Sequence, residues 1–300
     1  MDYQAELAPN IQANVSAALL EDLRLLSRKR HGGQAAQFQA LDYTAQLIPR
    51  DQQGSATIIT RQNAVLCGQP WFDACFKTLD PACIITWHAK EGDAVSANQV
   101  LCEVSGKARA MLSAERAALN FLQTLSATAT ATQKYVELVA GTQAKILDTR
   151  KTLPGMRVAQ KYAVKTGGGH NQRAGLFDGI LIKENHIMAA GGIGPVLAEA
   201  QRIAPQGMSI QIEVETIAQL SEALEAGAKL ILLDNFDLHA MRAAVKLTAG
   251  RAELEASGGI NPDSVRAIAE TGVDRISIGA LTKDIQAVDL SMRFKMSAAW

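Results

Sequence analysis

The chain has 300 residues, of which 48% are hydrophobic and 20% charged, and its 30 basic residues balance 30 acidic ones. This length and composition are those of a globular protein with one large domain or two ordinary ones. A formal net charge of zero argues against general electrostatic binding to nucleic acid, and no stretch approaches the roughly 20 apolar residues that span a membrane.

The amino-terminal sequence lacks the features of a secretion signal. Asp2, Glu6 and Pro9 stand where a basic start and an apolar segment would be needed. The four cysteines, at positions 67, 75, 83 and 102, form no CxxC pair, which is typical of buried thiols in a reducing compartment. We therefore expect a cytoplasmic protein.

The first part of the chain mixes helix and strand patterns. Apolar residues at helical spacing predict a helix over 11–30. Strand-like segments follow at 56–60, 64–67, 83–88 and 100–104. Glu91-Gly92 predicts a hairpin turn, and Ser113 is a plausible N-cap for a helix over 113–124. We expect an α+β open sandwich domain here.

From residue 144 onward, short apolar strands alternate with helical patterns. The predicted strands are 145–149, 179–183, 210–215, 230–234, 253–257 and 275–279, and the predicted helices are 154–165, 196–203, 217–226, 238–247 and 262–270. This alternation implies right-handed crossovers and a parallel sheet buried on both faces. Because fewer than eight strands are visible, we expect an irregular or incomplete (β/α) barrel over 126–285. The domain before it would span 1–125, and 286–300 would pack back on that domain.

Polar residues gather where each predicted barrel strand ends. They are Asp148, Thr149, Arg150 and Lys151; Lys183 and Glu184; Glu213 and Glu215; Asp234 and Asn235; Ser257, Gly258 and Gly259; and Gly279 with Ala280. A single charged strand end is common on a solvated surface, but six in succession favour an active site at the carboxyl end of the barrel.

The chemistry of these strand ends indicates a ligand that carries phosphate and further negative charge. The glycine turns at 257–259 and 278–280 let backbone amides approach an anion closely. Arginine binds carboxylates with two parallel hydrogen bonds, whereas lysine acts as a point charge on phosphoryl oxygens. Glu213 and Asp234 are placed to hold Mg²⁺ together with substrate phosphates. We expect a phosphorylated sugar diphosphate with magnesium.

Three segments of the chain resemble the signature of the quinolinate phosphoribosyltransferases, which are also called carboxylating nicotinate-nucleotide pyrophosphorylases. They are DTRKTLPG at 148–155, KTGGGHNQR at 165–173 and LIKENH at 181–186. ERAALN at 115–120 and the turn at 257–259 add to a resemblance that spans nearly the whole chain. LSATAT at 125–130 departs from the usual LSGIAT, at none of the charged positions.

The resemblance implies a reaction in NAD biosynthesis. Phosphoribose would pass from 5-phosphoribosyl 1-pyrophosphate to the ring nitrogen of quinolinate, with loss of the 2-carboxylate, to give nicotinate mononucleotide, CO₂ and pyrophosphate. Once alkylated, the pyridinium is itself the electron sink for decarboxylation, so no organic cofactor is needed. The resemblance also implies Mg²⁺ with the phosphoribosyl substrate and a homodimer.

The resemblance also divides the site residues among three groups. Residues that would bind the pyridine dicarboxylate are Arg150, His170, Arg173 and, from the neighbouring subunit, Arg116. Residues that would act on the reacting groups are Lys151, Lys183, Glu213 and Asp234, the two carboxylates by holding ribose hydroxyls and Mg²⁺. Residues that would complete the substrate pocket are Thr149, Glu215, Ser257, Gly258, Gly259, Ile278, Gly279 and Ala280.

Three other interpretations remain open at this point. A sibling phosphoribosyltransferase would act on another pyridine carboxylate. A Schiff-base lyase would use Lys151 or Lys183 as its nucleophile. A biotinyl or lipoyl carrier domain is suggested by the hairpin-like sequence KEGDAV at 90–95. Such a carrier needs a lysine at a hairpin tip, normally beside a Met for biotin, and Lys107 has no Met beside it. His186, at a probable helix start, is the member of the cationic cluster with the weakest support.

Overall fold

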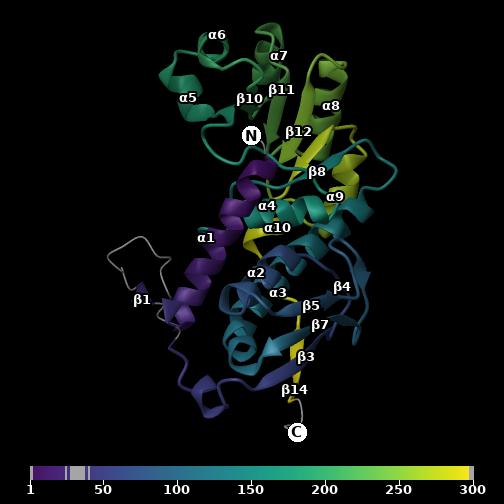
Figure 1. The fold of residues 1–300 in the computed structure, drawn as a ribbon. Coiled ribbons are helices and arrows are strands. Elements are labelled where there is room, and N and C mark those ends of the chain that lie inside the picture. Colours follow the sequence, from purple (N-terminus) through teal and green to yellow (C-terminus); the bar gives the residue numbers. More distant parts are fainter. Residues whose placement is uncertain (1–2, 24–25, 28–37, 40, 297–300) are drawn as a thin grey trace. The chain divides into compact units, whose positions relative to one another are not determined.

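The computed structural model describes residues 3–23, 26–27, 38–39 and 41–296 (Figure 1). The chain divides into two compact units. One unit comprises 131–285, and the other comprises 2–130 together with 286–300.

The unit that includes residues 41–130 is built on a four-stranded antiparallel sheet. Its strand order is β14 (Leu290–Met296), β3 (Gln53–Thr60), β7 (Val100–Lys107) and β5 (Ile84–Trp87). Two short antiparallel pairs are separate from it: β4 (Ala64–Val65) with β6 (Ala94–Val95), and β1 (Leu26–Ser27) with β2 (Phe38–Gln39).

The helices of this unit are α1 (Tyr3–Leu23), the 3₁₀ turn η1 (Ala45–Leu47), α2 (Gln69–Leu79) and the larger part of α3 (Ala108–Leu138). α2, which we did not predict, begins with a proline in its first turn and buries Trp71, Phe72 and Phe76 on one face. The predicted α+β character of this part is confirmed. The helix predicted over 11–30 is confirmed for 11–23, which belong to α1, and is wrong for 26–27, which form β1. Residues 24–25 and 28–30 lie outside the described residues.

Two local predictions in this unit are wrong. Ser113 is not an N-cap, because α3 runs for 31 residues and starts five residues earlier. No glycine or proline interrupts it, and its alanines favour the helix. Glu91-Gly92 forms a turn with φ +88° at the glycine, but not a hairpin, because β5 pairs with β7 whereas β6 pairs with β4.

The four cysteines are all buried, and none forms a disulfide. Burial raises the pKa of the Cys75 thiol to about 12 and, with smaller contributions from nearby carboxylates, that of Cys83 to about 11. At neutral pH these thiols therefore stay protonated and unreactive.

The second unit contains a six-stranded parallel sheet. Its strand order is β8 (Lys145–Leu147), β13 (Arg275–Ser277), β12 (Glu253–Ser257), β11 (Leu230–Asp234), β10 (Ser209–Val214) and β9 (Gly179–Ile182). The helices that alternate with them are α4 (Arg157–Thr166), α6 (Ile193–Ile203), α7 (Ile217–Glu225), α8 (Leu238–Thr248) and α9 (Pro262–Ala269). All six predicted strands and all five predicted helices are present. The additional α5 (Glu184–Ala189) and α10 (Ala280–Lys283) are short.

The sheet curls as a barrel but does not close. Within 131–285, every residue of which is described, β8 and β9 are the two edges and do not pair with each other. A single residue partly fills the gap beside β8. The His170 N–H donates to the Ile146 carbonyl at 2.8 Å, and the His170 carbonyl accepts from the Asp148 N–H at 3.1 Å. The predicted irregular, incomplete (β/α) barrel is confirmed.

The sequence places helix starts directly after the strand ends. Three of the helices have side-chain N-caps: Thr216 accepts from the Gln219 N–H, Asp237 from the Ala240 N–H, and Asn261 from the N–H groups of Asp263 and Ser264. The strands between them are buried, and Ile212, Leu233 and Ala256 are completely inaccessible to solvent. The polar residues at the strand ends are thus held between a rigid strand and a capped helix.

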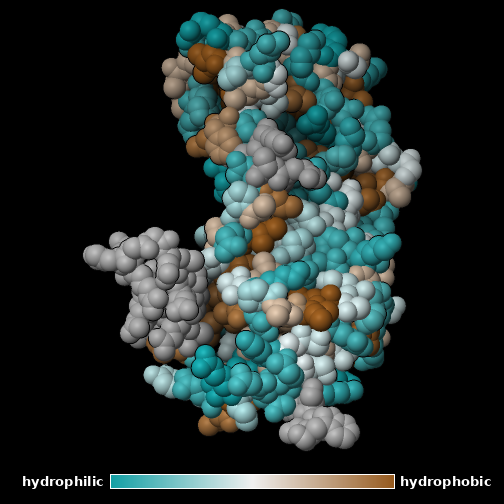
Figure 2. All heavy atoms as spheres, viewed as in Figure 1, coloured by the Kyte–Doolittle hydropathy of each residue, from teal (hydrophilic) through white to brown (hydrophobic). Residues whose placement is uncertain are grey.

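Apolar residues on the visible surface occur in small groups among hydrophilic ones (Figure 2). Such scattered exposure is usual on globular proteins. Among the described residues, no helix combines the length and apolar character that crossing a bilayer requires.

Candidate active site

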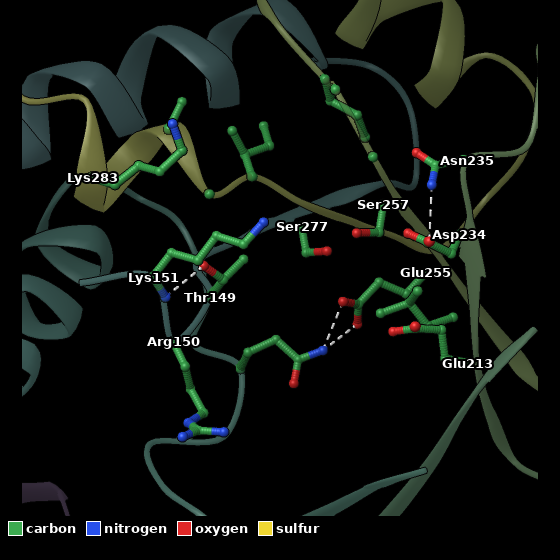
Figure 3. A pocket seen from close by; sticks show the side chains of 18 of the residues that line it. Thr149, Arg150, Lys151, Glu213, Asp234, Asn235, Glu255, Ser257, Ser277 and Lys283 are labelled. Carbon is green, nitrogen blue, oxygen red and sulfur yellow. Dashed lines mark hydrogen bonds between the residues drawn. The ribbon is translucent and has the colours of Figure 1, made fainter. Parts of the chain in front are cut away.

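A cavity of about 800 Å³ lies at the carboxyl ends of the parallel strands (Figure 3). It brings together 13 of the predicted site residues: Thr149, Arg150, Lys151, Arg173, Lys183, Glu213, Asp234, Ser257, Gly258, Gly259, Ile278, Gly279 and Ala280. Asn235, which we placed beside Asp234 at a strand end, also lines it. The lining further includes residues that we did not predict, among them Tyr135, Gln172, Glu255, Asn261, Ser277 and Lys283. Every lining residue belongs to the unit 131–285.

Lys151 lies against one of the two glycine turns. A Cβ added at Gly279 would lie 3.0 Å from Lys151 Cδ, so the absence of a side chain there is what lets the lysine stem approach the turn. The Lys151 N–H donates to Thr149 Oγ1 at 3.0 Å, and its carbonyl accepts from Thr282 Oγ1 at 2.8 Å. No carboxylate of the described chain is within ion-pair distance of its ammonium group. This lysine is fixed by its backbone and retains an unpaired charge.

Two guanidinium groups form a second cationic part of the cavity. Arg150 Nε is buried, and no described residue accepts a hydrogen bond from it. Arg173 Nη1 donates to the Gly179 carbonyl at 2.9 Å. Burial, and then the nearby charge of Arg150, lower the pKa of Arg173. Buried donors without a partner are costly, so this pair of arginines is arranged to accept an anionic ligand.

The acidic residues of the cavity have cationic or amide neighbours. Lys183 Nζ lies 2.6 Å from Glu213 Oε2, and the Glu213 carboxylate is only 8% exposed. Asn235 Nδ2 donates to Asp234 Oδ2 at 2.9 Å. The described chain contains no group of three or more His, Cys, Asp or Glu side chains that could hold a metal. A divalent cation at Glu213 and Asp234 would therefore take its remaining oxygen ligands from a substrate or from water.

Glu255 and Gln172 form a polar network that we did not predict. Glu255 is 1% exposed, and its two oxygens accept from Gln172 Nε2 at 2.7 and 2.6 Å. Gln211 Nε2 adds a third contact, at 3.0 Å to Oε2. The Gln172 side-chain oxygen accepts from the Arg173 N–H at 3.2 Å. A signal for Glu255 existed, because it stands two residues before Ser257 on one strand and so shares its face.

A buried ion pair supports the cationic side of the cavity. Lys161 of α4 and Asp148 are both fully buried and form a direct ion pair. Asp148 Oδ1 also accepts from the Gln172 N–H at 2.9 Å, and Lys161 Nζ donates to the Gln172 carbonyl at 2.8 Å. Burial raises the pKa of Asp148 to about 6, against the opposing effect of Lys161. The pair ties the end of β8 to the segment that carries Gln172 and Arg173.

His170 and Glu215 do not line the cavity. His170 is exposed as a residue, although its imidazole is partly covered. This partial burial, and then the charges of Lys145 and Arg275, which begin β8 and β13 at the opposite end of the sheet, lower its pKa. Glu215 follows the last residue of β10, and its N–H donates to Gln219 Oε1 at 2.7 Å, so it belongs to the start of α7. Because β10 ends at Val214, Glu215 does not share the strand face on which Glu213 lies.

Two further predicted residues have other surroundings. His186 is absent from the lining, and its Nδ1 accepts from the Lys183 N–H at 3.0 Å at the start of α5. It therefore orders the helix start that follows Lys183. Arg116 is an exposed residue of α3 in the other unit.

Known proteins resemble most of the chain. The N-terminal domain of quinolinate phosphoribosyl transferase matches residues 42–126, and its C-terminal domain matches residues 128–293. A Bacillus subtilis protein named a probable carboxylating nicotinate-nucleotide pyrophosphorylase is 41% identical over 256 residues, which cover 85% of this chain and 89% of the relative. A tobacco quinolinate phosphoribosyltransferase, named as mitochondrial, is 36% identical over 84% of this chain and 76% of its own length.

A solved structure agrees with these sequence matches. The nicotinate-nucleotide pyrophosphorylase of Francisella tularensis superposes with a TM-score of 0.87 at 42% identity, covering 96% of both chains. The chain belongs to the quinolinate phosphoribosyltransferase family.

Proposed function

We propose that the chain transfers phosphoribose from 5-phosphoribosyl 1-pyrophosphate to quinolinate with decarboxylation, giving nicotinate mononucleotide, CO₂ and pyrophosphate in NAD biosynthesis. The observation that carries this proposal is the composition of one cavity. It combines arginines with open hydrogen-bonding capacity, lysines, two glycine turns and partly shielded carboxylates. Family membership supports the same reaction.

The two glycine turns would hold the 5-phosphate of the sugar. Their backbone amides follow β12 and β13, the last two strands of the parallel sheet in chain order, where barrels commonly bind phosphate. Gly258 and Gly259 both have positive φ values, +108° and +58°. Replacing either glycine by a residue with a side chain would strain the backbone, because L-residues adopt this region poorly.

The carboxylates would hold the ribose and the metal. Glu213 and Asp234 would bind the ribose hydroxyls and the Mg²⁺ that accompanies the pyrophosphate, together with phosphate oxygens. Bound there, the ion would neutralise negative charge on the leaving group. The residues fit this role because both of these carboxylates line the cavity, and the described chain offers no larger protein-only ligand set.

The lysines would stabilise the pyrophosphate as it leaves C1. Lys151 is suited to this because it retains an unpaired charge beside Gly279, whereas Lys183 already neutralises Glu213. Charge fixed in position before the reaction stabilises charge that develops during it. The positive charge of the pyridinium nitrogen then stabilises the electron pair that stays on C2 as the 2-carboxylate leaves as CO₂, and a proton from solvent takes the vacated position.

The dicarboxylate would be bound by Arg150 and Arg173. Gln172 would support them in the place that we expected for His170, since its amide holds the Arg173 backbone and shields Glu255. A pyridine with only one carboxylate would leave a buried arginine without its partner, so nicotinate should be a poor substrate.

Arg116 would complete this pocket from the neighbouring subunit of a homodimer. Mixing Arg116→Ala protein with Lys151→Ala protein, each inactive alone, should restore part of the activity, because some mixed dimers would contain one intact site. Absence of any rescue under conditions where subunits exchange would remove the shared site from the proposal.

We also propose domain boundaries of 1–125 and 126–285, with 286–300 completing the first domain. The antiparallel pairing of β14 with β3 supports this division. A cytoplasmic location stays a proposal supported by the buried free thiols, since relatives from plants are named as mitochondrial or chloroplastic.

The decisive experiment is a turnover assay with quinolinate, 5-phosphoribosyl 1-pyrophosphate and Mg²⁺ that follows nicotinate mononucleotide and CO₂ together. Equal amounts of both products would support the proposal. Preference for nicotinate, or product without CO₂, would favour a sibling phosphoribosyltransferase. Borohydride trapping of a covalent adduct at Lys151 or Lys183 would favour a lyase instead.

A further inference from the structure

Asn235 has a backbone conformation that side chains other than glycine rarely adopt. Its φ is +56°, and among the described residues only Asn98 and Ala249 share this left-handed region without being glycine. Asparagine tolerates this region better than most residues, but the conformation still needs support from its surroundings. Asn235 follows Asp234, the last residue of β11, and lines the cavity.

The Asn235 side chain is held between two strand ends. Its Nδ2 donates to Asp234 Oδ2 at 2.9 Å, an interaction drawn in Figure 3. Its backbone N–H donates to the Ser257 carbonyl at 3.1 Å, which adds one bond beyond the β11–β12 ladder. On the other side, a Cβ added at Gly258 would lie 2.2 Å from Asn235 Oδ1. Gly258 therefore makes the space that the amide occupies.

These contacts fix one oxygen of the Asp234 carboxylate and leave the other to the cavity. The left-handed turn is what brings the amide of one residue back onto the carboxylate of its predecessor, because an extended residue at 235 would continue the strand and point its side chain elsewhere. Hydrogen bonds to ionised groups are stronger than those between neutral groups. The amide therefore restricts rotation of the carboxylate and also stabilises its negative charge.

We propose that Asn235 is a positioning residue that orients Asp234 toward the sugar of the phosphoribosyl substrate. It does not itself need to touch the substrate. The strain of its backbone is maintained because the turn delivers the amide to Asp234. Gly258 then serves two purposes, as an amide donor for phosphate and as the space for the Asn235 side chain. This inference rests on the proposed function, which assigns the sugar to Asp234.

The test separates the amide from the backbone conformation. Asn235→Gly keeps the left-handed turn accessible and removes the amide, and Asn235→Asp keeps the shape but places a second carboxylate beside Asp234. Asn98→Gly is the matched control, since Asn98 has φ +68° and does not line the cavity. Removing one hydrogen bond to a charged group should raise the KM for 5-phosphoribosyl 1-pyrophosphate roughly 10-fold in Asn235→Gly, with the KM for quinolinate changed by less than about twofold. Asn235→Asp should show a larger rise than Asn235→Gly.

A purely structural role would give a different pattern. If Asn235→Gly changed both KM values equally, or changed neither relative to Asn98→Gly, the positioning role would be overturned. Thermal unfolding of the two glycine variants shows whether the difference between the two KM values comes with a loss of stability. If Asn235→Gly alone were partly unfolded under the assay conditions, and this explained the difference, the positioning role would also be overturned.

Failure of the proposed function is recognised separately. If the wild-type protein does not turn over quinolinate, calorimetric titration with ribose 5-phosphate still tests the orientation of Asp234. Binding roughly 10-fold weaker in Asn235→Gly than in Asn98→Gly would support the inference, and equal binding would overturn it.

Discussion

The two ends of the six-stranded parallel sheet both carry clustered charges and both contain a cavity, yet their charges are used differently. At the amino end, a cavity of about 440 Å³ is lined by residues that include Arg251, Glu253 and Asp274. Glu253 is paired with Arg275, Asp274 accepts from the Leu254 N–H at 2.8 Å, and Arg251 donates to helix carbonyls. These charges are satisfied by the protein itself.

At the carboxyl end, several charges keep capacity for a ligand. Arg150 Nε is buried without an acceptor in the described chain, and Lys151 has no ion-pair partner there. The glycine turns add backbone donors. A charged strand end therefore indicates a binding site only when its groups still have hydrogen bonds to offer to a ligand. In this barrel such groups lie at the carboxyl end, where the active sites of barrels are built.

The largest expected effect is a difference in kcat between a lysine variant at the carboxyl end and an arginine variant at the amino end. Lys151→Ala should lower kcat roughly 10²- to 10³-fold, because it removes a fixed charge that stabilises the leaving group. Arg275→Ala should leave kcat within about twofold, because its exposed partner Glu253 can be solvated. Steady-state assays of both purified variants decide this. Similar losses in both would mean that the two ends do not differ in the way described.

The next comparison uses two glutamates on the same strand. Glu255→Gln should lower the free energy of unfolding by about 1–3 kcal/mol, because a buried acceptor of three amide contacts becomes partly a donor. Glu253→Gln, at the exposed beginning of β12, should cost at most about 1 kcal/mol. Urea unfolding followed by circular dichroism gives both values. A larger cost at Glu253 would contradict the assignment of the buried network.

A smaller effect distinguishes Gln172 from His170. Gln172→Ala should raise the KM for quinolinate roughly 10-fold, because Arg173 loses its support and Glu255 is left to repel the dicarboxylate. His170→Ala should change this KM by less than about twofold, because its side chain is not part of the cavity lining. A strong effect at His170 with none at Gln172 would restore our original expectation for the histidine.

The smallest effect depends on pH. Burial and the positive charges of Lys145 and Arg275 lower the pKa of His170, so the unfolded chain binds this proton more readily than the folded one. Acidification below the ordinary histidine pKa of about 6.5 should therefore destabilise the wild-type protein relative to His170→Gln. Thermal unfolding of the two proteins at neutral and mildly acidic pH should show the gap between their midpoints widening in favour of the variant. A gap independent of pH would place His170 away from those charges.

The barrel could be predicted because its strands and helices alternate with clear periods, and because buried strands read as short apolar runs. The strand-end residues could be predicted for the same reason, since parallel strands bring their carboxyl ends together. The hydrophobic periodicity of the sequence does not predict which sheet residues a loop contacts. The segment after α4 bonds to β8 through the His170 backbone, so the histidine and Gln172 have surroundings that spacing alone did not distinguish.

Residues inside elements were missed for a related reason. Glu255 lies within a strand rather than at its end, and Lys161 lies on a helix where a charge is normally solvated. Their burial follows from partners 83 and 13 residues away along the chain, Gln172 and Asp148. Only the folded arrangement reveals such pairs. Glu215 shows the opposite error, because we extended strand alternation one residue beyond the end of β10.

The buried pair of Asp148 and Lys161 has a consequence for how sequences of this kind can diverge. Replacing either residue alone would leave a buried charge without compensation, at a cost of about 3–5 kcal/mol. The same change would also remove one of the two hydrogen bonds to the Gln172 backbone: the one from its N–H if Asp148 is lost, or the one to its carbonyl if Lys161 is lost. Viable substitutions at these two positions should therefore occur together, and a sequence that has lost only one of them is expected to have lost the catalytic pocket as well.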